Sequence, residues 1–327
     1  MPATPEVLIS HDLPPAGSRV AGRMGDWDDL RAEIAERLPN ARVSVARNRA
    51  ETRERISSAT VLIAIRLSDD LLDAATNLRW IQSLYAGVGG FDVERLRERG
   101  IVLTSGAGIH AEAVAETVVG YMLLFERGFL QGLSQQRDRT WKRYPTGELV
   151  DGTLGIVGLG EIGRRVAELG QAFGMTVIGT KRNTDADIDP VDEVFGPEDL
   201  HTVANRSDYV VLACPLTAET RGLFGREEFV AMPSSSVLIN VARGPIVDQS
   251  ALVVALQEGS IRGAALDVTD PEPLSPESPL WTMPEVIVTP HVAGSTDQYW
   301  RRGAELFAEN YAKFVDDRVD EMRNRVA

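Results

Sequence analysis

The sequence contains little cysteine and little histidine. Cys214 is the only cysteine in 327 residues, which excludes an intrachain disulfide and favours a reducing compartment, so we expect a cytoplasmic protein. The four histidines, His11, His110, His201 and His291, lack the spacing of metal ligands, so we expect no metal. No apolar run reaches the roughly 18 to 20 residues that cross a bilayer, so we expect no membrane partner.

Positive charge is also scarce. The chain has 48 Asp and Glu against 34 Lys and Arg, and its net charge is −14. A field of this sign repels phosphates, and no basic stripe offsets it, which argues against a nucleic-acid partner. The first residues, MPATPEVLISHD, lack the basic and apolar segments of a secretory signal, so we expect no such leader.

Lysine is much rarer than arginine. Lys142, Lys181 and Lys313 are the only lysines, so 31 of the 34 cations (34 minus 3) are arginines. An acidic surface rich in arginine and poor in lysine is similar to those of proteins from salt-accumulating cells, and we favour a halophilic protein. The alternative is an acidic mesophilic enzyme encoded by a genome of high GC content.

Short apolar, β-branched runs alternate with helical patterns along the chain. In the first half the runs lie at 6–10, 42–46, 60–65, 78–84 and 101–105, with helical patterns at 27–38 and 91–100. A second series covers 153–174, 175–180, 207–216, 235–244, 262–269 and 285–291, and a helical, charged tail follows. Such alternation predicts an α/β protein with parallel sheets covered on both faces, and the length suggests two domains.

Between the two series lies a long segment rich in alanine, AEAVAETVVGYMLLFERGF at 111–129. It is apolar on more than one face. A helix of this kind is buried, and we expect it to lie between domains or between subunits.

The first chemical motif is GLGEIG, which follows the apolar run LGIV and precedes a helical pattern. Gly158 permits a tight turn, Gly160 lets the backbone approach a pyrophosphate, and Gly163 allows close packing of helix on strand. The helix N-terminus offers N–H groups to the phosphates. A plain tight turn is the alternative, but the strand–turn–helix context favours a dinucleotide.

About 20 residues further on, dinucleotide folds normally place an Asp or Glu that binds the ribose 2′-OH. Here the sequence has Thr180, Lys181, Arg182 and Asn183. No carboxylate would repel a 2′-phosphate, and two adjacent cations can pair with one. We therefore predict that NADP(H) is preferred and that NAD(H) is also accepted. The alternative is that both cations are solvated turn residues.

Reactive or polar residues follow the later strands. Cys214 and Pro215 end the run VVLACP, Arg243 ends LINVARG, Asp267 lies in GAALDV, and His291 ends VIVTPH. In open parallel sheets, ligands bind outside the carboxyl ends of the strands, so we expect these residues to meet in one crevice.

Each of these residues also has a structural interpretation. Arg243 could anchor a carboxylate or form a structural salt bridge. His291 could be a catalyst or a hydrogen-bonded polar group, and either Asp270 or Glu272 could be its partner. We expect Cys214 to pack on the adenine side of the site, because nothing marks it as a nucleophile.

Taken together, GLGEIG, CPLTAETRGL, LINVARGPIVD, GAALDVTDPEP and TPHVAGST resemble the D-isomer-specific 2-hydroxyacid dehydrogenases. The resemblance runs in order over nearly the whole chain. It implies two doubly wound parallel-sheet domains: a Rossmann cofactor domain at 108–291 and a discontinuous, flavodoxin-like substrate domain formed by 1–107 and 292–327. It also implies a homodimer formed through the 111–127 helix.

The resemblance also implies residue roles. The family's catalytic Arg, Glu and His fall on Arg243, Glu272 and His291, which selects Glu272 over Asp270, and Asp267 would face the nicotinamide carboxamide. With the motifs above, the expected cofactor-binding residues are Gly158, Leu159, Gly160, Glu161, Ile162, Gly163, Thr180, Lys181, Arg182, Asn183, Cys214, Pro215, Thr220, Val241, Ala242, Arg243, Asp267, His291 and Gly294.

The stretch LYAGVGGFD at 84–92 resembles the family's substrate loop. Successive N–H groups in a glycine turn can cradle a carboxylate. The expected substrate-binding residues are therefore Tyr85, Ala86, Gly87, Val88, Gly89, Arg243 and His291. Gly89 stands where the family often has Asp, and a plain strand–helix turn is the alternative.

The reaction implied by the resemblance is reversible hydride transfer between NADP(H) and a 2-ketocarboxylic acid or D-2-hydroxy acid. His291 would give its proton to the carbonyl oxygen during reduction, and Arg243 would stabilise the charge that develops there. Glyoxylate or hydroxypyruvate reduction, phosphite oxidation and a non-enzymatic, dinucleotide-sensing corepressor of the same fold remain alternatives.

Overall fold

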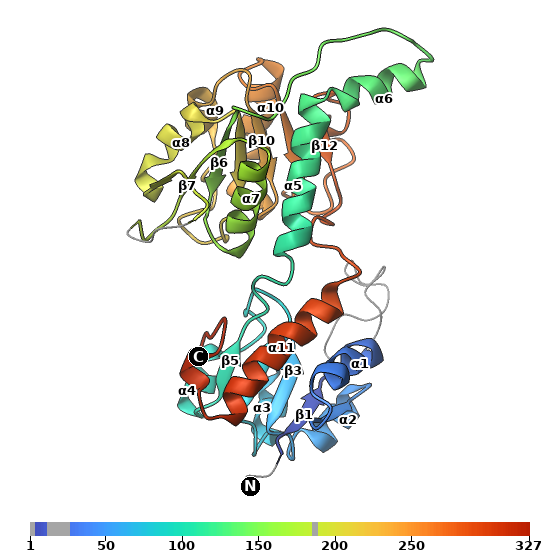
Figure 1. Ribbon diagram of the computed structural model, residues 1–327, viewed down its shortest axis with the longest axis vertical. Coiled ribbons are helices and arrows are strands. Elements are labelled where there is room, and N and C mark those ends of the chain that lie inside the picture. Colours follow the sequence, from blue (N-terminus) through green and yellow to red (C-terminus); the bar gives the residue numbers. More distant parts are fainter. Residues whose placement is uncertain (1–3, 12–26, 185–188) are drawn as a thin grey trace. The chain divides into compact units, whose positions relative to one another are not determined.

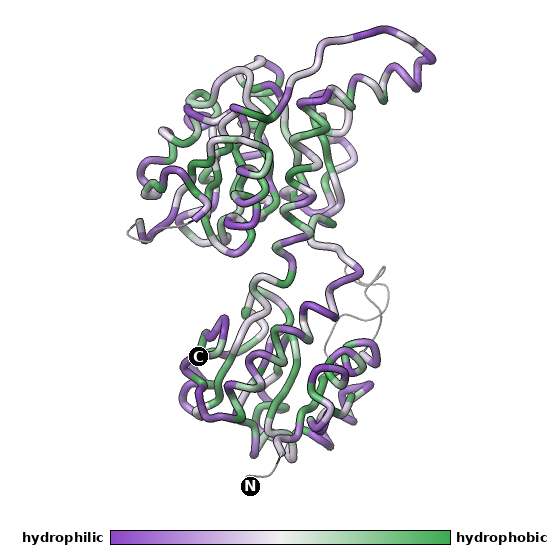
Figure 2. The backbone as a smooth tube through the Cα atoms, in the orientation of Figure 1, coloured by the Kyte–Doolittle hydropathy of each residue, from purple (hydrophilic) through white to green (hydrophobic). Residues whose placement is uncertain are grey.

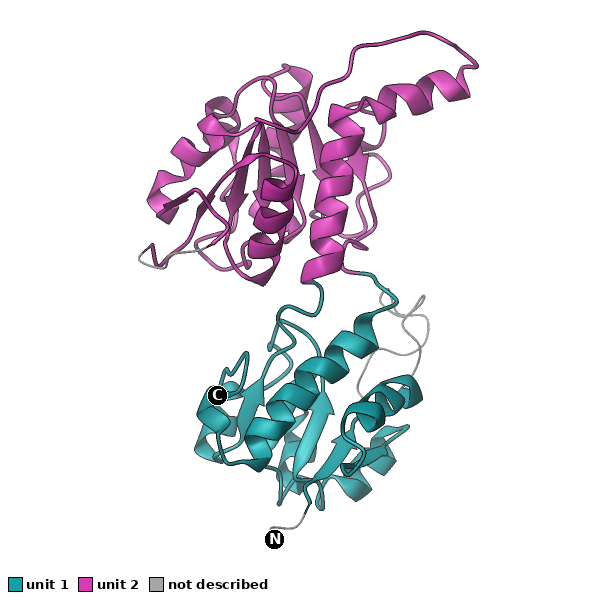
Figure 3. Ribbon diagram, in the orientation of Figure 1, with its two compact units in different colours: residues 1–110, 295–327 teal, residues 111–294 magenta. Residues whose placement is uncertain are grey.

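The computed structural model describes residues 4–11, 27–184 and 189–327. The chain divides into two compact units (Figure 3). Unit 1 combines residues 1–110 with 295–327, and unit 2 comprises 111–294. Among the described residues, no helix is long and apolar enough to cross a membrane. We expected no secretory signal in the first twelve residues. Of these, residues 1–3 and 12 lie outside the described part of the chain.

Unit 1 is built on a five-stranded parallel sheet with the order β2-β1-β3-β4-β5 (Figure 1). This is the flavodoxin-like order, as predicted. The strands are β1 (Glu6–Ile9), β2 (Arg42–Val45), β3 (Val61–Ala64), β4 (Trp80–Ser83) and β5 (Val102–Thr104). The helices are α1 (Trp27–Arg37), α2 (Arg49–Arg55), α3 (Asp69–Ala74), α4 (Val93–Glu98) and α11 (Tyr299–Val315).

Both faces of this sheet are covered, because strand residues alternate between two apolar clusters. Ile63 packs with residues of α1 and α11, such as Leu30 and Phe307. The adjacent Leu62 packs on the other face with residues of α2–α3–α4, such as Leu71. The near-continuous apolar runs of the sequence are therefore strands buried on both sides.

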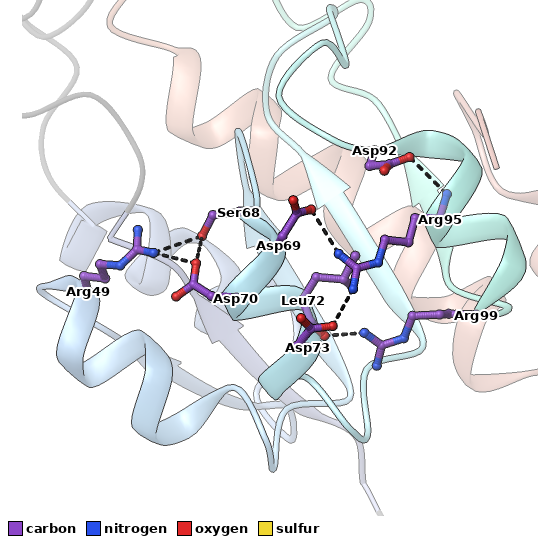
Figure 4. A network of polar contacts seen from close by, with 9 residues as sticks. All are labelled: Arg49, Ser68, Asp69, Asp70, Leu72, Asp73, Asp92, Arg95 and Arg99. Atoms are coloured by element: carbon purple, nitrogen blue, oxygen red, sulfur yellow. Dashed lines mark hydrogen bonds and ion pairs between the residues drawn. The ribbon is translucent and has the colours of Figure 1, made fainter.

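Arginines connect the helices on the α2–α3–α4 face (Figure 4). Arg49 donates to Asp70 at 2.6 Å, and Arg95 bridges Asp69 and Asp73. Arg99 donates to backbone carbonyls at the end of α3. These ion pairs are largely exposed to solvent, so each contributes little and is screened by salt.

Unit 2 is built on a seven-stranded parallel sheet with the order β12-β11-β10-β9-β6-β7-β8. Its strands are β6 (Thr153–Val157), β7 (Thr176–Thr180), β8 (Glu193–Phe195), β9 (Tyr209–Leu212), β10 (Val237–Asn240), β11 (Gly263–Leu266) and β12 (Val286–Val288). From β6 the chain winds first to one side and then, at β9, to the other. This is the Rossmann arrangement, in which ligands bind where the winding reverses.

Helices cover both faces of the second sheet as well. One face carries α5 (Ala111–Glu126) and α7 (Glu161–Ala172). The other carries α8 (Leu200–Arg206), α9 (Arg226–Ala231) and α10 (Gln249–Gln257). Short 3₁₀ turns complete the chain: η1 (Pro197–Asp199), η2 (Gly244–Ile246), η3 (Pro279–Trp281) and η4 (Val319–Glu321). The α/β class and the doubly wound layers are as predicted.

The long apolar helix predicted at 111–129 is α5, which is continued by α6 (Phe129–Arg137). Val118 and Met122 of α5 are fully buried in the core of unit 2, so packing within the unit accounts for part of its apolar surface. Figure 2 shows that hydrophobic positions occur along α5, mixed with polar ones. By contrast, α6 has no buried residue, and Phe129 and Leu133 are about half exposed.

Candidate active site

The predicted functional residues of unit 2 lie at one edge of its sheet. The register pairs the last residue of β6, Val157, with Thr180 of β7 and with Leu212 of β9. It likewise pairs the ends of β10, β11 and β12. The segments that carry Gly158, Cys214, Val241, Asp267 and Thr289 therefore all start from the same edge.

The three glycines of GLGEIG have different surroundings. Gly158 has φ +103°, and a Cβ there would lie 2.7 Å from the Cys214 Cα. A Cβ on Gly163 would lie 2.2 Å from the Gly158 carbonyl oxygen, but one on Gly160 would meet nothing within 4 Å. Gly158 and Gly163 are thus required by the turn and by packing, and Gly160 faces open space.

This open space lies at the N-terminus of α7, where Gly160 is the N-cap residue. The first N–H groups of a helix have no intrahelical acceptor, and the helix dipole favours an anion there. The loop therefore fits a pyrophosphate. Leu159 is buried and Ile162 packs partly against the core, whereas the Glu161 side chain is exposed.

The Thr180–Asn183 stretch follows β7 directly. The Thr180 carbonyl accepts from the N–H groups of Gly158 and Leu159 at 3.2 Å, which joins this strand end to the glycine loop. Lys181 is partly buried, and Arg182 and Asn183 are exposed. The strand end thus presents two cations beside the loop that fits the pyrophosphate.

The turn after β9 starts from the same edge of the sheet as the glycine loop. Cys214 is 9% exposed, and burial raises the pKa of its thiol, which disfavours the reactive thiolate. The Thr220 hydroxyl donates to the Pro215 carbonyl at 2.6 Å and accepts from the Thr217 N–H at 2.7 Å, which fixes the turn.

Sequence reasoning missed Glu219 in this turn. A hydrogen bond from Thr217 lowers the pKa of Glu219, and the positive charge of Arg182 lowers it further. The charge of Arg182 is therefore partly offset by this carboxylate. Glu219 lies within CPLTAETRGL, but that motif does not show which cation its charge acts on, because Arg182 lies in a separate loop.

Arg243 follows β10 in extended backbone, after the buried Val241 and Ala242. Its guanidinium donates to the Ala242 carbonyl at 2.6 Å. In the described part of the chain, no carboxylate lies within ion-pair distance of Arg243. A Cβ on Gly244 would lie 2.0 Å from the Thr269 carbonyl oxygen, so this loop packs tightly on the loop after β11.

His291 and Glu272 form the pair that best fits acid–base chemistry. His291 Nδ1 lies 3.1 Å from Glu272 Oε2, with the two side chains 44% and 28% exposed. Glu272 Oε1 also accepts from the Thr269 N–H at 3.3 Å. Of the two carboxylates that the sequence offered, Glu272 is the one in contact with the histidine.

Asp267 is 3% exposed, and its carboxylate has partners that the sequence did not suggest. One oxygen accepts from the Thr289 hydroxyl at 2.6 Å and from the Val292 N–H at 2.9 Å. The other accepts from the Ala293 N–H at 2.9 Å. Gly294, which ends this segment, is partly buried. The expected contact between Asp267 and a carboxamide stays a prediction.

The predicted substrate loop, Tyr85 to Gly89, follows β4 in unit 1. Its base is fixed by the Tyr299 hydroxyl, which donates to the Leu84 carbonyl at 3.0 Å, and by the Gly106 N–H, which donates to the Tyr85 carbonyl at 2.8 Å. Among residues 4–11, 27–184 and 189–327, nothing accepts from the N–H groups of residues 86–89. A Cβ on Gly87 or Gly89 would meet nothing within 4 Å.

The described residues contain no group of three His, Cys, Asp or Glu that could hold a metal ion. The site therefore consists of a glycine loop at a helix N-terminus, two cations beside it, a guanidinium and a His–Glu pair. This arrangement suits a dinucleotide and a substrate that gains or loses a proton.

Comparison with known proteins agrees with a site that binds a dinucleotide. The sequence model described as "D-isomer specific 2-hydroxyacid dehydrogenase, NAD binding domain" matches residues 119–293. Glyoxylate reductase from Aeropyrum pernix is 34% identical over 329 residues, which cover 96% of this chain and 94% of that protein. The chain belongs to the D-isomer specific 2-hydroxyacid dehydrogenase family.

Two further proteins are similar to this chain. D-3-phosphoglycerate dehydrogenase from Methanocaldococcus jannaschii is 33% identical over 86% of this chain, but the match spans only 55% of that longer protein. The structure of NADPH-dependent glyoxylate/hydroxypyruvate reductase from Sinorhizobium meliloti, with NADP and sulfate, has a TM-score of 0.76 and 27% identity. It covers 99% of this chain and 98% of its own. The protein is thus by class an NAD(P)-dependent 2-hydroxyacid dehydrogenase, and a nicotinamide dinucleotide is its cofactor.

Proposed function

We propose that this enzyme reduces a small 2-keto acid of the glyoxylate or hydroxypyruvate type to the D-2-hydroxy acid, with NADPH preferred over NADH. The observation that carries the proposal is the 3.1 Å contact between His291 Nδ1 and Glu272 Oε2. It lies at the same sheet edge as the glycine loop and as Arg243, which has no carboxylate partner among the described residues. The names of the relatives support the substrate class.

The cofactor would supply or accept the hydride when bound. Its pyrophosphate would lie over Gly160 at the N-terminus of α7, where a side chain would fill open space. Lys181 and Arg182 would hold the 2′-phosphate by charge-assisted hydrogen bonds. Two cations, with no carboxylate between Thr180 and Thr184, support the preference for NADPH.

His291 is the proton donor of the reduction. Because its Nδ1 is bonded to Glu272, the nitrogen available to the substrate is Nε2. Nε2–H gives its proton to the carbonyl oxygen, and the same nitrogen takes the proton back during oxidation. Glu272 orients the ring through its contact with Nδ1.

Arg243 stabilises the negative charge that develops on the carbonyl oxygen and attracts the substrate carboxylate. Its planar guanidinium keeps N–H groups available beyond the one that it gives to Ala242. For unit 1 we propose that the open N–H groups of residues 86–89 bind a substrate carboxylate.

We also propose a homodimer formed through α5 and its continuation α6. The half-exposed Phe129 and Leu133 on α6 support it, because apolar side chains of this size gain free energy when a partner covers them. Light scattering tests the proposal. The wild type should have twice the mass of the chain, and Phe129→Glu with Leu133→Glu should shift it to a monomer. A wild type that is monomeric at micromolar concentration refutes the proposal.

The decisive test of the activity is a substrate panel. Glyoxylate, hydroxypyruvate, pyruvate and larger 2-keto acids are reduced with NADPH or NADH, at low and at multimolar KCl, and phosphite oxidation is assayed in parallel. We expect the highest kcat/KM for a small 2-keto acid with NADPH. Turnover of phosphite alone would show a different dehydrogenase of the same fold. Cofactor binding at one equivalent without any turnover would show a dinucleotide sensor.

A further inference from the structure

His291 adopts a backbone conformation that side-chain-bearing residues avoid. Its φ is +55°, in the left-handed region. For a residue other than glycine this conformation is strained, and it persists only where surrounding contacts hold it. The contacts around His291 therefore show what maintains the geometry of the proposed proton donor.

The segment on either side of His291 is held by one buried residue. The Asp267 carbonyl accepts from the His291 N–H at 2.8 Å. The Asp267 carboxylate accepts from the N–H groups of Val292 and Ala293, the next two residues, both at 2.9 Å. Three successive backbone N–H groups thus point at one aspartate, which fixes the turn that carries the imidazole.

The carboxylate is itself held by two hydroxyl groups in series. The Thr289 hydroxyl lies 2.6 Å from Asp267 Oδ1, and the Tyr121 hydroxyl lies 2.5 Å from the Thr289 hydroxyl. The Thr289 hydroxyl donates its single proton to Asp267, so it accepts from Tyr121. Burial raises the pKa of Tyr121 to about 12, which keeps this phenol protonated and able to donate.

The three side chains come from separate elements of unit 2. Tyr121 lies on α5, Asp267 follows β11 and Thr289 follows β12. The bonds are buried or partly buried, so solvent screens them weakly and each polar group depends on the next. A missing hydroxyl would leave a buried acceptor or donor without its partner.

We propose that Tyr121, Thr289 and Asp267 form a positioning relay that holds the His291 turn in its left-handed conformation and thereby keeps Nδ1 on Glu272. The inference rests on the proposed role of His291 as the proton donor. The relay touches neither Nδ1 nor Glu272. It acts through the backbone, so its loss should lower the fraction of enzyme with a correctly placed imidazole.

Thr289→Val is the direct test, because valine has nearly the same shape as threonine but no hydroxyl. We expect kcat for keto-acid reduction to fall about 10- to 100-fold, as expected when a catalytic group is misplaced by about 1 Å. The dissociation constant of NADPH and the KM of the keto acid should change less than about threefold. Thr289→Ser keeps the hydroxyl and should restore most of the turnover.

Tyr121→Phe should lower kcat in the same direction, by a smaller factor. Tyr209→Phe is the matched control, because Tyr209 is also buried in unit 2 and its hydroxyl also bonds to an α5 residue, Glu126. It should reduce the unfolding temperature but leave kcat unchanged. A Thr289→Val enzyme with wild-type kcat would overturn the relay, as would equal losses in Thr289→Val, Thr289→Ser and Tyr209→Phe.

Adding His291→Gln separates this inference from the proposed function. In the His291→Gln background, Thr289→Val should have no further effect on kcat, because both changes act on the same imidazole. If His291→Gln alone keeps wild-type turnover, the proposed proton donor is wrong. If His291→Gln removes turnover but Thr289→Val has no effect in the wild-type background, only the relay is wrong.

Discussion

The cations after β7 allow a quantitative prediction. Lys181→Ala combined with Arg182→Ala removes both proposed partners of the 2′-phosphate and leaves the glycine loop intact. A hydrogen bond to a charged group contributes about 1.5 to 3 kcal/mol when it is shielded. Arg182 is exposed and Lys181 only partly buried, so we take the low end and discount it for screening. The pair then contributes about 2 to 3 kcal/mol.

At 1.4 kcal/mol for each factor of ten, this corresponds to an increase of about 30- to 150-fold in the dissociation constant of NADPH. NADH has a hydroxyl in place of the phosphate, and its dissociation constant should change less than about twofold. Fluorescence titration of both cofactors at low ionic strength measures the two constants. The difference between them should shrink in high KCl, because salt screens exposed charges.

The chain offers a matched control for the loss of two positive charges. Lys142 and Arg143 are also an adjacent, exposed Lys–Arg pair in unit 2, on the segment after α6. Lys142→Ala with Arg143→Ala changes the net charge equally and should leave both cofactor affinities unchanged. Equal losses of NADPH and NADH affinity in the Lys181–Arg182 variant, or the same loss in the control, would refute the reasoning.

Three further predictions follow from the charges of the molecule. Glu219→Gln removes a negative charge that acts on Arg182 and should tighten NADPH binding about two- to fivefold, with NADH unchanged, in the same titration. Burial alone would raise the pKa of Glu126, but hydrogen bonds from Tyr209 and Arg262 outweigh it and lower the pKa from 4.5. A carboxylate whose pKa is lowered on folding stabilises the fold at pH values above its ordinary pKa. Glu126→Gln should therefore lower the free energy of unfolding by about 1 kcal/mol at pH 7, after allowance for screening. Urea unfolding should show that this loss vanishes as the pH falls below about 4.5. In multimolar KCl, screening of the repulsion within the net charge of −14 should raise the unfolding temperature. Screening of the arginine ion pairs of Figure 4 acts in the opposite direction. An unfolding temperature that is already at its maximum without salt counts against a salt-adapted protein.

The alternation of apolar runs was sufficient to predict the fold, because parallel strands buried on both faces read as continuous hydrophobic segments. The run GAALDV became β11, and VIVTPH became β12 followed by the His291 turn. The edge strand β8 was not predicted. It has three residues, Glu193–Phe195, and none of them is fully buried, so it has no apolar signature.

Side-chain partners were less predictable than strand ends. The spacing of GLGEIG separates the role of Gly160 from those of Gly158 and Gly163, because each role follows from local geometry. The bond from Tyr121 to Thr289 joins residues 168 positions apart. A helical pattern shows that Tyr121 faces the core but not which polar group its hydroxyl reaches, so such a contact follows only from the tertiary fold.

The central claim is that His291 supplies the proton in keto-acid reduction, and His291→Gln tests it most directly. Steady-state turnover of glyoxylate or hydroxypyruvate with saturating NADPH should fall by a factor of about 10² to 10⁴, the usual contribution of a general acid. The dissociation constant of NADPH should stay within about twofold of the wild type, because the phosphates bind at the glycine loop. Turnover close to that of the wild type would contradict the account.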